Sequence, residues 1–253
     1  MKPAEDFGKL RTERTNPAAA ELDARSTLEI ARILNTEDAR VAPAVERALP
    51  QITQAIDAIT EALSRGGRLI YVGAGTSGRI AALDASECPP TFNTDPRAVQ
   101  CVIAGGSRAI SRAAEINEDS PRLGRGDMAK KRPTKKDVVV GISASGRTPY
   151  TLGAIEYARE RGATTVAVTG NPGSPLQRVA EIAIVVETGP EVVAGSTRMK
   201  AGTAQKLVLN MLSTGAMTRL GYVYGNLMVN VHRKNRKLRE RGLSILERAA
   251  GIN

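Results

Sequence analysis

Short aliphatic runs recur along the middle of this chain, and they limit what it can fold into. Two of them lead straight into loops of small residues and then into a predicted helix start. Short buried strands that alternate with helices are typical of a parallel sheet covered on both faces. Aromatic residues make up only 3% of the chain and Trp is absent, so the core is expected to be aliphatic, which suits buried parallel strands. We therefore predict an α/β fold with a five-stranded parallel sheet, its strands at 69–72, 99–103, 138–140, 164–168 and 182–186.

The segment before the first strand is predicted to be an arm followed by helices. Residues 1–25 are polar and lack periodicity. Ser26 and Glu29 form a capping-box pattern at the start of a short helix. An apolar stripe from Leu49 to Leu63 indicates a longer helix, which a glycine pair ends.

The rest of the chain completes the predicted organisation. A long helix is expected over about 200–220, and a basic helix over about 231–249. The chain is thus divided into an N-terminal arm with helices (1–58), a central α/β domain (59–222) and a C-terminal helical segment (223–253).

The loop after the first strand is rich in glycine and hydroxyl groups, with the sequence Gly73-Ala74-Gly75-Thr76-Ser77-Gly78. Unpaired amides and the helix dipole at such a position attract an anion. The loop also matches the G-x-G-x-x-G dinucleotide pattern, but that pattern needs an acidic residue at the end of the next strand, and the second strand continues into Ala104-Gly105-Gly106-Ser107. A phosphate loop is therefore favoured over a nicotinamide site, while a turn without a ligand stays open.

The loop after the third strand, Ser143-Ala144-Ser145-Gly146-Arg147-Thr148, carries three hydroxyls. Ser and Thr can donate to phosphate oxygens, and a glycine lets the backbone approach closely. The alternative is that Thr148 simply caps the helix that begins at Pro149. No Gly-Lys-[Ser/Thr] sequence follows either loop, so a nucleoside triphosphate loop is not supported.

A third candidate lies at the start of the long helix, in the segment from Ser196 to Thr203. It offers helix amides together with Lys200. A capped helix whose small residues pack closely is an equal alternative. The predicted phosphate-binding residues of the three loops are Gly75, Thr76, Ser77, Ser143, Ser145, Gly146, Thr148, Ser196 and Lys200.

The composition excludes several classes of protein. The net charge is +10, yet aromatic stacking residues are missing near the basic segments, so nucleic acid is not expected as a partner. The only histidine is His232, which disfavours Ser-His-Asp chemistry and histidine metal sites. The two cysteines make no metal or disulfide pattern. No signal core or membrane span is found, so a cytoplasmic location is expected.

One acidic residue, Glu87, stands just before Pro89-Pro90 in a run that is otherwise typical of a surface turn. The run from Gly73 to Phe92 closely resembles N-acetylmuramic acid 6-phosphate etherases, members of the sugar isomerase (SIS) superfamily. Two further runs share this resemblance, 138–149 and 195–210, and it extends over almost the whole chain.

The resemblance implies a fold, a reaction and two catalytic residues. The fold is a SIS-type three-layer sandwich flanked by N- and C-terminal helices, and the reaction replaces the ether-linked D-lactate of a phosphorylated amino sugar by water. Glu87 matches the family's proton donor. The family's second glutamate lies in a Glu-Gly-Ala-Glu-Asp pattern, where this chain has Glu115-Ile116-Asn117-Glu118-Asp119, so Glu118 is its base. An acid that works near neutral pH needs a raised pKa, and we therefore hypothesise that Glu87 lies in a largely dry pocket close to Glu118.

The resemblance also implies a homodimer and no metal or organic cofactor. Family members usually carry a further small helical domain at the C-terminus, which we expect this chain to lack. Two alternatives remain, a non-catalytic SIS sugar-phosphate sensor and a sugar-phosphate isomerase on the same fold.

Overall fold

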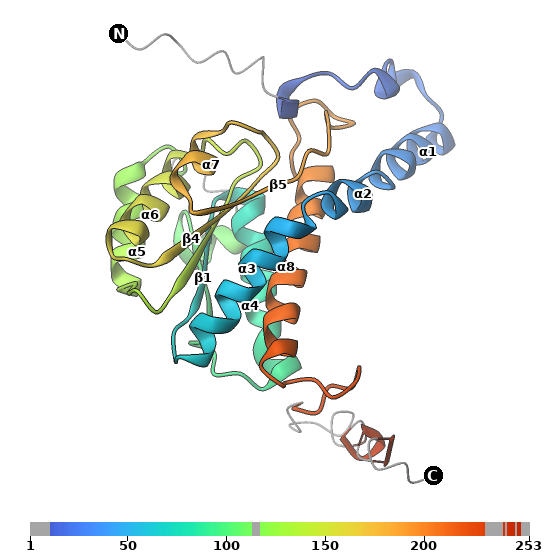
Figure 1. Cartoon of the computed structure of the whole chain (residues 1–253). Coiled ribbons are helices and arrows are strands. Elements are labelled where there is room, and N and C mark those ends of the chain that lie inside the picture. The colour runs from blue at the N-terminus through green and yellow to red at the C-terminus, as the bar shows by residue number, and fades with distance from the viewer. Residues whose placement is uncertain (1–10, 113–116, 231–239, 241, 246, 249–253) are drawn as a thin grey trace.

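The central sheet has five parallel strands and is covered by helices on both faces (Figure 1). In this computed structural model the described residues are 11–112, 117–230, 240, 242–245 and 247–248. The strand order is β2-β1-β3-β4-β5. The predicted α/β class and parallel sheet are confirmed. The strands are β1 (Leu69–Gly73), β2 (Val99–Ile103), β3 (Val138–Ile142), β4 (Thr164–Thr169) and β5 (Ile182–Val185).

The helices divide between the two faces of the sheet. On one face lie α2 (Val41–Glu46), α3 (Leu49–Ser64), α4 (Gly75–Phe92) and α8 (Lys200–Arg219). On the other lie α5 (Pro121–Lys131), α6 (Pro149–Glu160) and α7 (Pro175–Val179). None of the described helices combines the length and the hydropathy needed to cross a bilayer.

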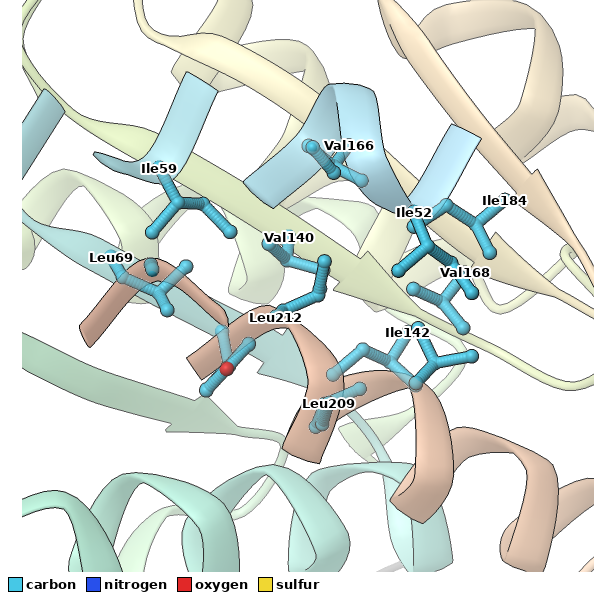
Figure 2. Close-up of a cluster of buried hydrophobic side chains, with 14 of the residues drawn as sticks. Ile52, Ile59, Leu69, Val140, Ile142, Val166, Val168, Ile184, Leu209 and Leu212 are labelled. Atoms are coloured by element: carbon cyan, nitrogen blue, oxygen red, sulfur yellow. The ribbon is translucent and has the colours of Figure 1, made fainter. Parts of the chain in front are cut away.

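Two apolar clusters hold the three layers together, because successive strand residues point to opposite faces. Val140 and Ile142 face α3 and α8, whereas Val139 faces α6. Figure 2 shows Leu212 of α8 beside Val140 and Ile142, and Ile52 of α3 near Val168 of the next strand. Burying an aliphatic side chain of this size contributes about 1.5–3 kcal/mol, so the core is mainly aliphatic, as predicted, with Tyr71, Phe92 and Tyr150 as its buried aromatic members.

The N-terminal helices follow the sequence pattern closely. α1 (Thr27–Asp38) begins after Ser26, and the capping box with Glu29 is present, as predicted. α1 extends away from the sheet (Figure 1), and Leu28 on it is 57% exposed. The predicted division between residues 58 and 59 falls inside α3, and the predicted C-terminal helix over 231–249 lies largely outside the described residues.

α4 is longer than its sequence indicates. The sequence predicts a helix over about 77–83 and then a turn, but the helix continues through Pro89 and Pro90 to Phe92. Each proline lacks an N–H and leaves one carbonyl without its helical donor. The helix ends at Asn93, which has a left-handed φ of 56° and donates its N–H to the Pro89 carbonyl. The turn alternative for Glu87 is therefore wrong, because this residue lies within a helix.

Candidate active site

The neighbouring strands β1 and β3 define the position of the site. Gly73 at the end of β1 is paired with Ile142 at the end of β3. The chain leaves these two strands toward opposite faces, into α4 and α6. Ligands of open α/β sheets bind at such a reversal, beyond the carboxyl ends of the strands. The first two predicted phosphate loops therefore lie side by side where a ligand is expected.

The loop after β1 leads into α4, and its N-cap residue, Ala74, offers no side-chain cap. Gly75 has φ +51°, a conformation that favours glycine. Ser77 is buried and Thr76 is half-buried. Gly78 packs so closely that a Cβ there would lie 2.5 Å from Cγ1 of Ile103. The glycines thus allow a tight strand-to-helix turn, which places the first amides of α4 at the carboxyl edge of the sheet.

The hydroxyls of the loop after β3 point toward one another. The Ser143 hydroxyl lies 2.9 Å from that of Thr148 and 3.3 Å from that of Ser145. Thr148 precedes α6, but its side chain makes no capping hydrogen bond, so the alternative that its hydroxyl caps α6 is wrong. The amide of Gly146 donates to the carbonyl and hydroxyl oxygens of Ser143, which holds the loop in shape.

Gly146 also has a packing reason to be glycine. Its φ is +67°, and a Cβ there would lie 2.3 Å from Oγ of Ser174 at the start of α7. Any larger residue would push this hydroxyl-lined loop away from the sheet edge.

Glu118 joins the two loops. A Cβ on Gly75 would lie 3.1 Å from Oε1 of Glu118, so this carboxylate lies against the start of α4. The Glu118 carbonyl accepts the amide hydrogen of Tyr150, in the first turn of α6. The structure therefore brings together Glu118, the Gly75–Ser77 turn and the Ser143–Thr148 loop.

The start of α8 differs, because the protein's own carboxylates occupy it. Glu191 accepts the amide hydrogens of Lys200 and Ala201, each at 2.9 Å. The Lys200 side chain is 1% exposed, and its ammonium group donates to Glu37. Ser196 lies in a turn just before this helix, where its amide donates to Val193. Lys200 therefore faces Glu37 and not the hydroxyl cluster. This arrangement agrees with the alternative of a capped helix.

The two carboxyls at the start of α8 are shifted in opposite directions. Burial acts to raise the pKa of Glu37, but hydrogen bonds from Lys200 and Asn16 and the charges of Lys200 and Arg40 outweigh it and lower the pKa. Burial raises the pKa of Glu191, although the amides of Ala201 and Lys200 act against it. Sequence reasoning missed both residues. Glu37 acts on a lysine far along the chain, and Glu191 acts on helix amides across a loop.

The start of α8 nevertheless lies beside the start of α4. A Cβ on Gly202 would lie 3.5 Å from Cγ2 of Thr76 and 3.6 Å from Cδ1 of Ile80. The glycine allows the two helices to come close together. The third predicted loop is thus a neighbour of the first, although its lysine is engaged elsewhere.

A buried polar network connects β1, α4 and α8. Asp84 accepts hydrogen bonds from the hydroxyl of Tyr71 at 2.8 Å, the amide of Asn210 at 2.9 Å and the hydroxyl of Ser213 at 3.1 Å. Burial raises the pKa of Asp84 despite these three donors. Sequence reasoning missed this residue, although it lies one helical turn before Cys88 on the buried face of α4. Its partners hold α4 in register with α8.

The cysteines offer no nucleophile at neutral pH. Burial raises the pKa of both Cys88 and Cys101 to about 12. Both are free thiols. The thiolate is the reactive form, so these buried and half-buried thiols serve in packing.

Glu87 does not join the other site residues within the single chain. It is exposed, and it lies about 18 Å from Gly75 along α4, at about 1.5 Å per residue. Glu118 lies at the Gly75 end. The hypothesis of a dry pocket shared by Glu87 and Glu118 is therefore wrong for the single chain.

A large groove lies at the opposite edge of the sheet. It has a volume of about 710 Å³ and is lined by Arg68, Arg97 and Gln100 among other residues. These residues precede or begin strands, whereas ligands of such sheets bind beyond the carboxyl ends. The chemistry of the β1 and β3 loops therefore locates the candidate site better than groove size.

The fold and the loops at the β1–β3 reversal define a SIS domain. The SIS domain family matches residues 127–215, and the glucokinase regulatory protein N-terminal SIS domain matches residues 51–159. Among solved structures, a putative phosphosugar isomerase from Bacteroides fragilis shares the fold with a TM-score of 0.61 at 20% identity, over 82% of this chain and 98% of that one. A phosphoheptose isomerase from Francisella tularensis has a TM-score of 0.60 at 20% identity, over 77% of this chain and 100% of that one.

Similarity to curated sequences narrows this class to one family. An N-acetylmuramic acid 6-phosphate etherase from Edwardsiella ictaluri is 57% identical over 95% of this chain and 80% of its own length. One from Streptomyces avermitilis is 57% identical over 96% of this chain and 78% of its own length. The chain belongs to the N-acetylmuramic acid 6-phosphate etherases, a family of carbon–oxygen lyases.

Proposed function

We propose that this chain cleaves the D-lactyl ether of N-acetylmuramic acid 6-phosphate to give N-acetylglucosamine 6-phosphate and D-lactate, as a step of cell-wall amino sugar recycling. Its relatives among the N-acetylmuramic acid 6-phosphate etherases support this substrate. The observation in the structure that supports it most is Glu118: its carboxylate lies against the glycine turn at the start of α4, and its carbonyl is bonded to the first turn of α6, which follows the cluster of three hydroxyls. This arrangement suits a base beside a bound sugar phosphate.

The phosphate is proposed to bind at the start of α4 and at the hydroxyls that follow β3. Amides at a helix N-terminus and the helix dipole attract the dianion. Thr76, Ser77, Ser143, Ser145 and Thr148 supply hydroxyl donors on both sides of that position. The phosphate would then fix the sugar with its reacting carbons near Glu118.

The reaction needs two groups that move protons. In the open-chain sugar the aldehyde makes C2–H acidic, and the proposed base Glu118 takes this proton. The C3–O bond then breaks, and Glu87 protonates the departing lactate oxygen. Water adds at C3 of the unsaturated aldehyde, Glu87 accepts its proton, and Glu118 returns a proton to C2. The two carboxyls end in their starting states, so no cofactor is required.

The test measures D-lactate release and solvent deuterium uptake at C2 side by side. Glu118→Gln is expected to lose both by roughly 100-fold or more, the usual size of an acid–base contribution. Glu87→Gln is expected to lose lactate release but to keep deuterium uptake, because the base remains. Normal lactate release in either variant would remove that residue from the mechanism.

The same assay separates the alternatives. A non-catalytic SIS sensor would bind the sugar phosphate without releasing lactate, and an isomerase would form a ketose from a simpler sugar phosphate. The presence of both Glu87 and Glu118 favours the etherase. We further propose a homodimer and a cytoplasmic location, in keeping with the two free thiols.

A further inference from the structure

α5 and α6 lie side by side on one face of the sheet (Figure 1), and two glycines bring their backbones into contact near the helix starts. A Cβ on Gly124 of α5 would lie 1.9 Å from the carbonyl oxygen of Tyr150, and a Cβ on Gly153 of α6 would lie 2.3 Å from the carbonyl oxygen of Pro121. Each glycine thus meets the backbone of the other helix, where no side chain fits. This reciprocal contact fixes the position of α5 against α6.

Tyr150 extends the same contact in both directions along the chain. Its amide donates to the Glu118 carbonyl at 3.0 Å, and its hydroxyl donates to Asp127 at 2.8 Å. Its side chain is 0% exposed. The amide, carbonyl and hydroxyl of Tyr150 therefore all contact the segment 118–127. Since Tyr150 comes two residues after Thr148, the helix turn that follows the proposed phosphate hydroxyls also holds the segment that carries the proposed base.

α6 is the more firmly held of the two helices. Ile155 packs into β3, where a Cβ on Gly141 would lie 2.6 Å from its Cγ1. The buried residues of α5 are Gly124 and Met128, whereas those of α6 are Tyr150, Thr151, Gly153, Ala154, Ile155 and Ala158. A group inserted between the two helices therefore displaces α5, together with Glu118, and leaves α6 and the hydroxyls before it in place.

We propose that Gly124, Gly153 and Tyr150 are positioning residues for the base. The backbone contact of α5 with α6 sets how far the Glu118 carboxylate extends toward a substrate held by the phosphate loops. This inference rests on the proposed function, because it takes Glu118 as the base. Proton abstraction needs a short distance between the carboxylate and C2, and a misplacement of about 1 Å can cost about 100-fold in rate.

A methyl group at position 153 tests the proposal. Gly153→Ala forces the two helix starts apart by about 1 Å, because 2.3 Å is far below an ordinary contact. We expect kcat for D-lactate release and solvent deuterium uptake at C2 to fall together by about 100-fold. The affinity for N-acetylglucosamine 6-phosphate, measured by calorimetry, should stay near the wild-type value, because the hydroxyls remain with α6.

Gly126→Ala is the matched control. It makes the same chemical change on α5, but this glycine is exposed and a Cβ there meets nothing within 4 Å. It should keep the wild-type kcat and deuterium uptake. A folded Gly153→Ala protein with normal kcat would overturn the proposal. Equal losses of kcat and of affinity for the sugar phosphate would do the same, because the contact would then be a general packing contact.

Tyr150→Phe gives a second measurement that keeps the buried ring and the backbone contacts. Loss of its hydrogen bond to Asp127 is expected to lower deuterium uptake about 5-fold, with unchanged affinity for N-acetylglucosamine 6-phosphate. Tyr157→Phe, on the same helix, removes a hydroxyl that accepts from Arg161 and should have no effect. If Gly153→Ala does not fold, Tyr150→Phe decides alone, and a wild-type rate in it ends the proposal.

Glu118→Gln in the same assays separates this inference from the proposed function. If it loses deuterium uptake while Gly153→Ala and Tyr150→Phe keep wild-type rates, the positioning role is wrong and the proposed function stands. If Glu118→Gln keeps deuterium uptake, the assignment of the base fails, and the inference fails with it.

Discussion

The start of α6 and the start of α8 are two helix N-termini at the same edge of the sheet, and they have different occupants. Before α6, the hydroxyls of Ser143, Ser145 and Thr148 lie together, and the Thr148 hydroxyl does not cap the helix. At α8, Glu191 takes the first amides, and Lys200 is buried against Glu37. The comparison shows that α8 begins with its first amides bonded to the protein's own carboxylate, whereas α6 is preceded by hydroxyls that a phosphate can use.

The largest expected effect comes from breaking the filled site. Lys200→Met leaves Glu37 buried without its ammonium partner, although Arg40 and Asn16 remain. Removing one partner of a buried pair costs about 3–5 kcal/mol, and we expect a loss near the lower end of this range in urea unfolding. Near-normal stability together with a large rise in KM would instead make Lys200 a phosphate ligand. The start of α8 would then be an anion site like the loop before α6.

The pH dependence of stability sharpens the same side of the comparison. The pKa of Glu37 is lowered in the folded chain, so its contribution is full above its ordinary pKa of about 4.3 and is lost as the pH falls through the lowered value. Glu37→Gln should therefore be clearly less stable than wild type at pH 7, and the difference should shrink in acid. Unfolding curves from pH 7 to pH 3 measure this.

Glu191→Gln is the matched control for that experiment. The pKa of Glu191 is raised, so its contribution is full below the unfolded value and falls as the pH rises through the folded one. Its difference from wild type should not shrink on acidification. The same acid trend in both variants would contradict the assignment of the two carboxyls.

The smallest effect is expected at the open site. Ser143→Ala removes the hydroxyl at the centre of the cluster, and a lost hydrogen bond to a charged group costs about 1.5–3 kcal/mol. We expect KM for the sugar phosphate to rise at least about 10-fold. The free energy of unfolding should fall by only about 1 kcal/mol, because the amide of Gly146 keeps its bond to the Ser143 carbonyl. Ser64→Ala, at an exposed hydroxyl beside the amino end of β1, is the control and should leave KM unchanged. An unchanged KM in Ser143→Ala would mean that the phosphate binds elsewhere.

The sequence by itself determined the local architecture. Aliphatic runs specified five parallel strands, Ser26 with Glu29 specified the start of α1, and the glycine- and serine-rich loops followed the strands as predicted. These features depend on neighbouring residues, whose spacing and backbone preferences are visible in a linear pattern. The family resemblance was visible in the same way.

Only the tertiary structure decided which groups meet. Glu37 reaches Lys200, and Asp84 reaches Asn210, across more than a hundred residues of chain. Glu118 comes to Gly75, while Glu87, on the same helix as Gly75, is carried away from it. Such pairings follow from strand order and helix packing, which no local pattern encodes, because a helix keeps residues at its two ends apart however close they are in sequence.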